Sequence, residues 1–152
     1  MTDAEQIRGL LQARADALHA RDPLASVAVL ADEVVSYDLA PPLAHAIGAT
    51  RDRSDLERWY ATWATPIASE APDQHIEVSG DLALAYGLVH MTGAKTDGEA
   101  VDIWFRSTLG LRRIAGAWKI VHEHASTPFY MDGSQRAATD LKPKAQAPAG
   151  RV

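Results

Sequence analysis

The chain has no cysteine among its 152 residues, which excludes disulfide bonds, thiolate nucleophiles and cysteine-ligated zinc sites. It also lacks an apolar run of membrane-spanning length. Its first residues, MTDAEQIRGLLQARADALHARD, have neither the basic start nor the unbroken apolar centre of a signal peptide. The 15 Lys and Arg residues are scattered through a chain of net charge -5, whereas nucleic-acid binding needs a concentrated basic face. We therefore expect a cytoplasmic protein with neither nucleic acid nor membrane as a partner.

The composition that remains is that of one globular domain. Apolar residues make up 47% and charged residues 23% of the chain, and 152 residues are enough to enclose a hydrophobic core. The last segment, residues 142–152 (KPKAQAPAGRV), has almost nothing to bury and is predicted to be disordered. We place the domain at residues 1–141.

Three amphipathic segments in the first half of the chain predict helices. Each begins with a side chain that can accept hydrogen bonds from the free backbone N–H groups of a first helical turn, namely Thr2, Asp22 and Ser54. Apolar residues then recur every three or four positions. The expected helices span residues 3–21, 23–31 and 54–67.

The second half of the chain changes to an alternating, strand-like pattern. Turns that contain glycine separate its apolar segments, which favours an antiparallel meander. The expected strands span residues 34–39, in the first half of the chain, and residues 75–78, 82–93, 101–112 and 118–126. Three helices can cover only one face of such a sheet, so we predict an α+β fold in which N-terminal helices pack on a curved antiparallel sheet and enclose a cone-shaped cavity. The uncovered face would be exposed or would form a homodimer.

Two segments carry a resemblance to a known family. They are Arg106-Ser-Thr108 and the stretch from Gly116 to Phe129, GAWKIVHEHASTPF. Together with the order of elements, they resemble the SnoaL-like and ketosteroid isomerase-like branch of the nuclear transport factor 2-like superfamily, from about Asp3 to Leu141. The ending is also similar to the association domain of calcium/calmodulin-dependent kinase. The resemblance implies the fold but not one function, because this fold hosts isomerases, cyclases, dehydratases, epoxide hydrolases and non-catalytic hubs.

Asp38 is the first candidate for chemistry. It lies where the resemblance to ketosteroid isomerases implies a general base, a carboxylate that moves a proton next to a carbonyl group. Those enzymes also use a tyrosine and a neutral aspartic acid as an oxyanion hole, but this chain has Arg14 or Ala15 and Thr108 at those places. Steroid isomerisation by that mechanism is therefore not expected. The alternative interpretation of Asp38 is a turn residue that hydrogen-bonds the local backbone.

The histidine pair His122 and His124 lies at positions i and i+2 of a predicted strand, so both side chains point to one face. Two-residue turns at Asp97–Gly98 and Ala115–Gly116 would place that face with Leu109, toward the cavity. A single bulge would move both histidines to the opposite face. The pair could contribute to a pocket, hydrogen-bond within the structure or bind a metal. No third ligand accompanies the pair, so we predict no metal and no cofactor.

These arguments lead to two sets of candidate site residues. The candidate catalytic residues are Asp38, with His122 or His124 as the acid or orienting group. The candidate ligand contacts are Tyr60, Trp63, Tyr86, Arg106 and Ser126. Tyr60 and Trp63 also fit a helical core stripe, Arg106 also fits an interface, and His45 lies in a loop that could flank the cavity mouth.

Two functions fit the sequence. The first is a small-molecule enzyme, an isomerase, cyclase or hydratase that uses acid–base chemistry on an apolar or carbonyl-containing ligand. The second is a non-catalytic domain for ligand binding or association.

Overall fold

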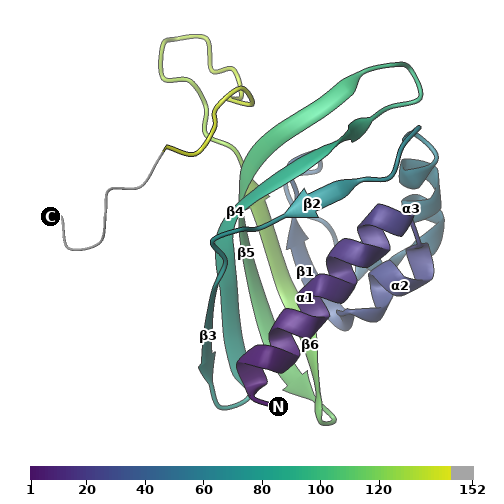
Figure 1. The fold of residues 1–152 in the computed structure, drawn as a ribbon, viewed down its shortest axis with the longest axis vertical. Coiled ribbons are helices and arrows are strands. Elements are labelled where there is room, and N and C mark those ends of the chain that lie inside the picture. Colours follow the sequence, from purple (N-terminus) through teal and green to yellow (C-terminus); the bar gives the residue numbers. More distant parts are fainter. Residues whose placement is uncertain (145–152) are drawn as a thin grey trace, which may run out of the picture.

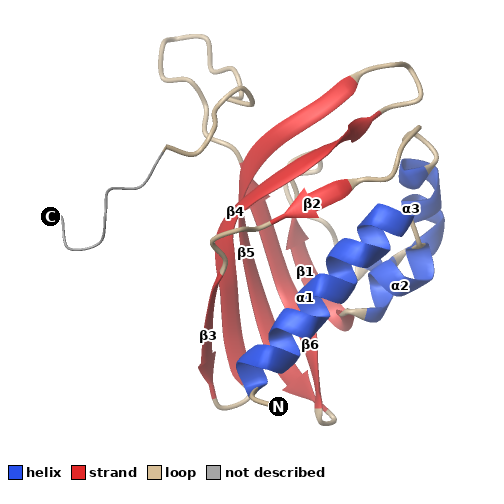
Figure 2. Ribbon diagram, viewed as in Figure 1, coloured by secondary structure: helices blue, strands red, loops and turns tan. Residues whose placement is uncertain are grey.

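The structure, a computed structural model, describes residues 1–144 and has the predicted α+β architecture (Figure 2). Its elements, in chain order, are α1 (Asp3–Ala20), α2 (Pro23–Ala28), β1 (Leu30–Tyr37), η1 (Ala49–Arg51), α3 (Arg53–Tyr60), β2 (Ala68–Glu70), β3 (His75–Ser79), β4 (Leu82–Ala94), β5 (Ala100–Ile114) and β6 (Ala117–Ser126). Of the predicted disordered tail, residues 145–152 lie outside the described residues. No helix of the described part is long and apolar enough to cross a membrane.

The sheet is a curved layer in which the order of strands is β1-β6-β5-β4-β2, with β3 also paired to β4. The strands from β3 to β6 form the predicted antiparallel meander, while β1 adds to β6 in parallel. All three helices lie on the concave side, and α1 crosses that side diagonally (Figure 1). The sheet therefore has an inner face toward the helices and an uncovered outer face.

The helix starts agree with the sequence at two of three places. Thr2 and Glu5 form the capping box of α1, and the Asp22 side chain accepts from the Ala25 N–H at the start of α2. The third prediction was wrong in both bounds, because Asp52, not Ser54, caps α3 and the helix ends at Tyr60. The chain after Tyr60 turns toward the sheet, and residues 68–70 pair with β4 as a strand, β2, that was not predicted.

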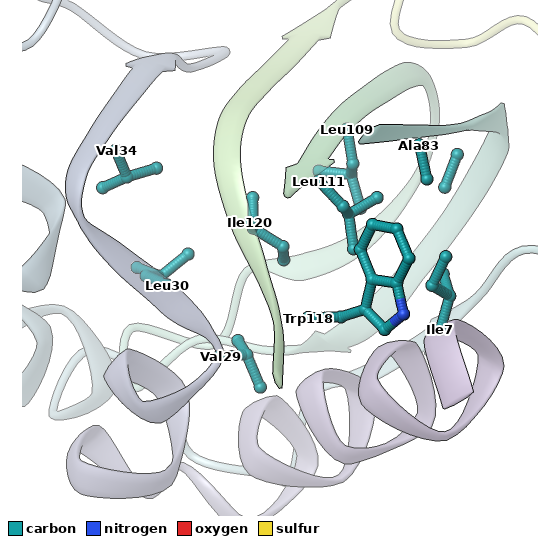
Figure 3. Packing of buried hydrophobic residues seen from close by; sticks show 10 residues of the cluster. Ile7, Val29, Leu30, Val34, Ala83, Leu109, Leu111, Trp118 and Ile120 are labelled. Atoms are coloured by element: carbon teal, nitrogen blue, oxygen red, sulfur yellow. The ribbon is translucent and has the colours of Figure 1, made fainter. Parts of the chain in front are cut away.

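The hydrophobic core fills the closed end of the cone, between α1 and the inner face of the sheet. Ile7 of α1 lies beside Trp118 (Figure 3), in a cluster that also contains the fully buried Leu111 and Ile120. Burying a side chain of this size contributes roughly 1.5–3 kcal/mol. This core fixes how α1 lies across the strands.

The turn between β4 and β5 is longer than predicted, and this corrects the register. The Lys95 N–H donates to the Glu99 carbonyl at 2.8 Å, so three residues, not Asp97–Gly98 alone, form the loop. Gly98 has a φ of 91°, which suits the left-handed position of such a loop. Each residue of β4 therefore pairs one position earlier in β5 than predicted. Tyr86, for example, pairs with Thr108 instead of Leu109. Tyr86 therefore lies on the outer face.

A bulge in β6 produces the second correction. Leu111 pairs with Ile120 and the neighbouring Gly110 pairs with His122, so Val121 is the extra residue. The bulge moves the predicted face of His122 and His124 from the cavity to the outer side. It also turns the residue between them, Glu123, to the inner face.

Candidate functional site

An open cavity of about 1670 Å³ lies between the helices and the inner face of the sheet. Much of its wall is apolar. The apolar lining includes Leu11, Leu56, Trp59, Val89, Met91 and Phe105. Polar side chains converge on one region of this wall, where Arg14, Asp38, His45, Thr50 and Glu123 line the cavity. Apolar walls with a few convergent polar groups are typical of small-molecule sites.

Glu123 is the centre of these polar groups. Its Oε1 accepts a hydrogen bond from Nη2 of Arg14 at 2.8 Å, and its Oε2 accepts from the Ser36 hydroxyl at 2.7 Å. The Thr50 hydroxyl lies 2.9 Å from that of Ser36 and 3.5 Å from Oε2. Only 12% of the Glu123 side chain is exposed, so the bulge has buried a carboxylate together with its partners.

These contacts keep Glu123 ionised. Burial alone would raise the pKa of its carboxyl group, but the positive charge of Arg14 and the hydrogen bonds from Ser36, Arg14 and Thr50 outweigh burial and hold the pKa below its usual value. Both carboxylate oxygens are already occupied. Glu123 is therefore a structural anion in the cavity wall and is unsuited to accept a proton at neutral pH.

Asp38 has the opposite character. Its Oδ2 lies 2.9 Å from Nε2 of His45, and its side chain is 46% exposed toward the open cavity. Burial raises the pKa of Asp38, and the nearby negative charge of Glu123 raises it further, against the lowering influence of His45 and Arg14. A carboxylate with a raised pKa in a cavity suits proton transfer. Within residues 1–144 the partner of the Asp38 side chain is His45 and not the backbone of the turn, which the turn interpretation would require.

The loop after β1 folds back along its own strand and brings His45 to Asp38. The His45 N–H donates to the Ser36 carbonyl at 3.3 Å, and the Gly48 N–H donates to the Val34 carbonyl at 2.8 Å. Gly48 has a φ of 74°, and a Cβ there would lie 2.6 Å from the Asp32 carbonyl oxygen. Only glycine fits this return point. The turn thus places His45, which the sequence had put near the mouth, in the cavity lining.

Tyr60 and Trp63 belong to both the core and the cavity wall. Tyr60 is 6% and Trp63 3% exposed, and they pack with Ile67 in a second core cluster. The Tyr60 hydroxyl lies 2.6 Å from that of Ser26, and burial raises the pKa of Tyr60. Trp63 covers Gly93, where a Cβ would lie 2.8 Å from the indole ring. Both residues also line the cavity, so the core interpretation is confirmed and their role as ligand contacts stays a prediction.

The other predicted site residues lie on the outer face and do not line the cavity. Nδ1 of His122 is 2.7 Å from the Val35 carbonyl oxygen, and Tyr37 contacts the rings of His122 and His124 edge-on. Arg106 and Ser126 pair with each other across β5 and β6. Tyr86, as described above, lies on this face too. The structure therefore separates Asp38 from the histidine pair with which it was grouped.

The sequence interpretation missed Glu123, Ser36 and Thr50 as site residues. Ser36 lies in an alternating strand and is 1% exposed, which a polar residue tolerates only with hydrogen-bond partners. Ile120 and Glu123 are three residues apart, so regular alternation predicts that they lie on opposite faces of the sheet. Only the bulge at Val121 brings them to the same face, and the sequence does not reveal that bulge. Among residues 1–144, no group of three or more His, Asp or Glu side chains is arranged to hold a metal ion.

Known proteins place this fold in a family. The SnoaL-like domain profile matches residues 7–130. A nuclear transport factor 2-like protein of unknown function from Pseudomonas putida is 32% identical, with 94% of this chain and 99% of that chain covered and a TM-score of 0.79. No curated protein matches the chain.

More distant structures share the fold alone. A scytalone dehydratase candidate from Novosphingobium aromaticivorans is 18% identical, with 99% of this chain and 95% of that chain covered and a TM-score of 0.71. A ketosteroid isomerase-like protein from Erwinia carotovora is 19% identical, with 80% and 93% covered and a TM-score of 0.66. Because the profile match spans most of the domain, the chain belongs to the SnoaL-like domain family of the nuclear transport factor 2-like superfamily.

Proposed function

We propose that the chain binds a small, largely apolar carbonyl compound in its cavity, and that Asp38 with His45 transfers a proton on that compound without a cofactor. The observation that carries this proposal is a carboxylate of raised pKa, 2.9 Å from an imidazole nitrogen, beside apolar walls. His45 takes the role that the sequence suggested for His122 and His124. The superfamily contains isomerases and dehydratases, which is compatible with this class of chemistry. We place this activity in the cytoplasm.

The reaction class follows from the position of Asp38. Its carboxylate removes a proton from the carbon beside the carbonyl, and the electron pair moves onto the carbonyl oxygen as an enolate. Return of the proton from Asp38 to another carbon gives an isomer. Loss of a β-hydroxyl group as water, with a proton supplied by the Asp38–His45 pair, gives a dehydration instead.

Hydrogen–deuterium exchange tests the proposal without a known substrate. A panel of small enolisable ketones in heavy water is followed by proton NMR for loss of the signal beside the carbonyl. The wild type should accelerate exchange for at least one ketone, and Asp38→Asn should abolish the acceleration. Asp32→Asn is the matched control, because Asp32 lies on β1, the strand that Asp38 directly follows, but its side chain is 89% exposed and pairs with Arg51. Absence of exchange with every ketone, or an unchanged rate in Asp38→Asn, contradicts the proposal.

A second candidate function, association, is favoured by the outer face. Leu84 and Leu88 are 46% and 40% exposed there, and Phe129, after β6, is 64% exposed. We propose that this face pairs with a second copy of the chain as a homodimer. Leu88→Lys should then convert a dimer to a monomer in sedimentation equilibrium, while Leu24→Lys, at an exposed leucine of α2, should leave the mass unchanged. A monomeric wild type contradicts the dimer.

A further inference from the structure

Most of the histidines lie on the outer face of the sheet. Four of the six in the chain are there, namely His75, His90, His122 and His124. Each contacts an aromatic ring of the same face, with ring centroids between 4.4 and 5.4 Å apart. Histidine is the side chain whose charge ordinarily changes between about pH 5 and pH 8. The charge of the face proposed above for the homodimer therefore depends on pH.

Two of these histidines have a carboxylate that can compensate a positive charge. Nε2 of His90 lies 2.6 Å from Oδ1 of Asp102, and Glu70 is the register partner of His90 on β2. Glu77 lies two residues after His75 and shares its face of β3. A carboxylate beside an imidazole favours the charged form of the ring. His75 and His90 can therefore take up a proton without leaving an isolated charge on this face.

The pair on β6, His122 and His124, has no such partner. Within residues 1–144, ion pairs of histidine are made by His45 and His90, and none by the β6 pair. The register neighbours of the pair on β5 and β1 carry no formal charge at neutral pH: Gly110, Thr108, Val35 and Tyr37. The charged side chains next along this face of β5 and β6 are all basic: Arg106, Arg112 and Lys119.

The carboxylates near the pair in sequence are directed elsewhere. Glu123, between the two histidines, points to the inner face and binds Arg14, and Asp38, after β1, pairs with His45. Glu33 lies in the stretch of β1 whose pairing with β6 is interrupted, and it makes no ion pair with either histidine. A proton taken up by His122 or His124 therefore adds a positive charge to a region that is already basic.

The separated chain can accommodate this charge, whereas a covered face cannot. Nδ1 of His122 lies 2.7 Å from the Val35 carbonyl oxygen and carries the proton of that hydrogen bond, so a second proton enters at Nε2 and leaves the bond intact. In the separated chain water solvates the new charge. In a homodimer the second copy covers the same face, and a buried charge without a partner is costly. Protonation therefore favours the separated chains.

We propose that His122 and His124 are a pH switch in the homodimer. The uncharged rings pack around Tyr37 beneath the second copy, and their protonation below about pH 6.5 separates the two copies. This inference rests on the homodimer proposed above and concerns its regulation, not the reaction in the cavity. The pair that the bulge at Val121 removed from the cavity thus regulates association.

The test is sedimentation equilibrium of the full chain at about pH 7.5 and about pH 5.5, at constant ionic strength. If each copy releases one proton on association, the dissociation constant rises tenfold per proton for each pH unit below about 6.5. For two protons per dimer, the wild type should dissociate about 100-fold more readily at the lower pH. Tryptophan fluorescence should show a folded chain at both pH values, and return to the higher pH should restore the dimer.

Histidine variants identify the groups that titrate. His122→Gln combined with His124→Gln keeps polar side chains but removes both titrating rings, and should dimerise equally at the two pH values. His19→Gln is the matched control, because His19 is exposed on α1 and should keep the full pH dependence. His90→Gln should also keep it, because Asp102 compensates the charge of that ring.

The outcomes distinguish this inference from the homodimer on which it rests. A wild type that dimerises equally or more tightly at the lower pH overturns the switch, while the homodimer stands. If the double glutamine variant dissociates at the lower pH as the wild type does, other groups titrate and the inference is again overturned. A wild type that is monomeric at both pH values removes the homodimer and the switch together.

Discussion

The inner and outer faces of β6 carry different kinds of side chain, although they belong to one strand. The inner face begins with Trp118 and Ile120, which are buried in the core, and continues after the bulge with Glu123. The outer face carries His122 and His124, packed on Tyr37. One extra residue, Val121, decides which of these side chains the cavity receives.

One strand, β6, therefore contributes both to the hydrophobic core and to the wall of the cavity. Before the bulge, the inner face holds the apolar core at the closed end of the cone. After it, the same face supplies a carboxylate that organises Arg14 and Ser36. The buried carboxylate of Glu123 is tolerated because Arg14 of α1 and Ser36 of β1 donate hydrogen bonds to it.

Removal of the bulge should have the largest effect. Deletion of Val121 would turn Glu123 to the outer face and His122 inward, which leaves Arg14 and Ser36 without their anion. We expect a loss of more than about 4 kcal/mol in the free energy of unfolding, measured by urea denaturation. Val121→Ala keeps the register and should cost about 1 kcal/mol or less. A deletion variant as stable as the wild type would show that the bulge does not set the faces.

Truncation of the core before the bulge should come next. Ile120 is fully buried in the core cluster that also contains Leu111 and Ile7 of α1, and Ile120→Ala should lower the free energy of unfolding by about 2–5 kcal/mol. The rate of ketone exchange, corrected for the folded fraction, should remain that of the wild type because Ile120 is not among the residues that line the cavity. A loss below about 1 kcal/mol would contradict the packing of this end.

Glu123→Gln removes the charge after the bulge, and we expect a loss of about 1–3 kcal/mol at pH 7. The folded pKa of Glu123 is lowered, so between that value and 4.5 the unfolded chain binds more protons. The stabilisation by the ionised group is complete above pH 4.5 and disappears as the pH falls through the folded pKa. Denaturation at several pH values should show the wild type and the variant converge at acid pH. A difference in the free energy of unfolding that does not change with pH would show that the loss comes from altered packing and not from the lost charge.

Asp38→Asn should change the free energy of unfolding in the opposite direction to Glu123→Gln. The folded pKa of Asp38 is raised, so between 3.8 and that value the folded chain binds more protons, and wild-type stability falls as the pH rises. At pH 7 the variant should therefore be as stable as the wild type or slightly more so, and this advantage should vanish below pH 3.8. Melting temperatures across this range measure the effect. A variant that is destabilised at pH 7 would identify Asp38 as a structural residue.

The outer histidines should give the smallest effect. His122→Ala removes the contact of Nδ1 with the Val35 carbonyl, and we expect a loss of about 0.5–1.5 kcal/mol. Ketone exchange should be unchanged, because His122 lies on the outer face of the sheet, away from the cavity. If His122→Ala loses ketone exchange while its stability is unchanged, His122 takes part in the reaction and its assignment to the outer face is contradicted.

Local signals predicted most of the fold. The capping box of Thr2 and Glu5, the Asp22–Pro23 start of α2 and the places of the glycine turns each depend on a few neighbouring residues. The structure contains them, although the turn before β5 is one residue longer than predicted. The end of α3 was wrong because contact with β4, distant in sequence, overrides helix propensity after Tyr60. The candidate site was predicted less well. Asp38, Tyr60 and Trp63 line the cavity, whereas four of the other five candidates depended on the face of β5 or β6.

The sequence by itself determined the class of fold, the order of its elements and the family, because periodicity, caps and turns are properties of short segments. The tertiary structure alone decided which side chains meet in the cavity. A strand alternates faces with every residue, so one additional residue in the Thr96–Gly98 turn and one in β6 invert every assignment that follows. That inversion moved His122 and His124 outward and brought Glu123 to Arg14 and Ser36 at the wall of the cavity.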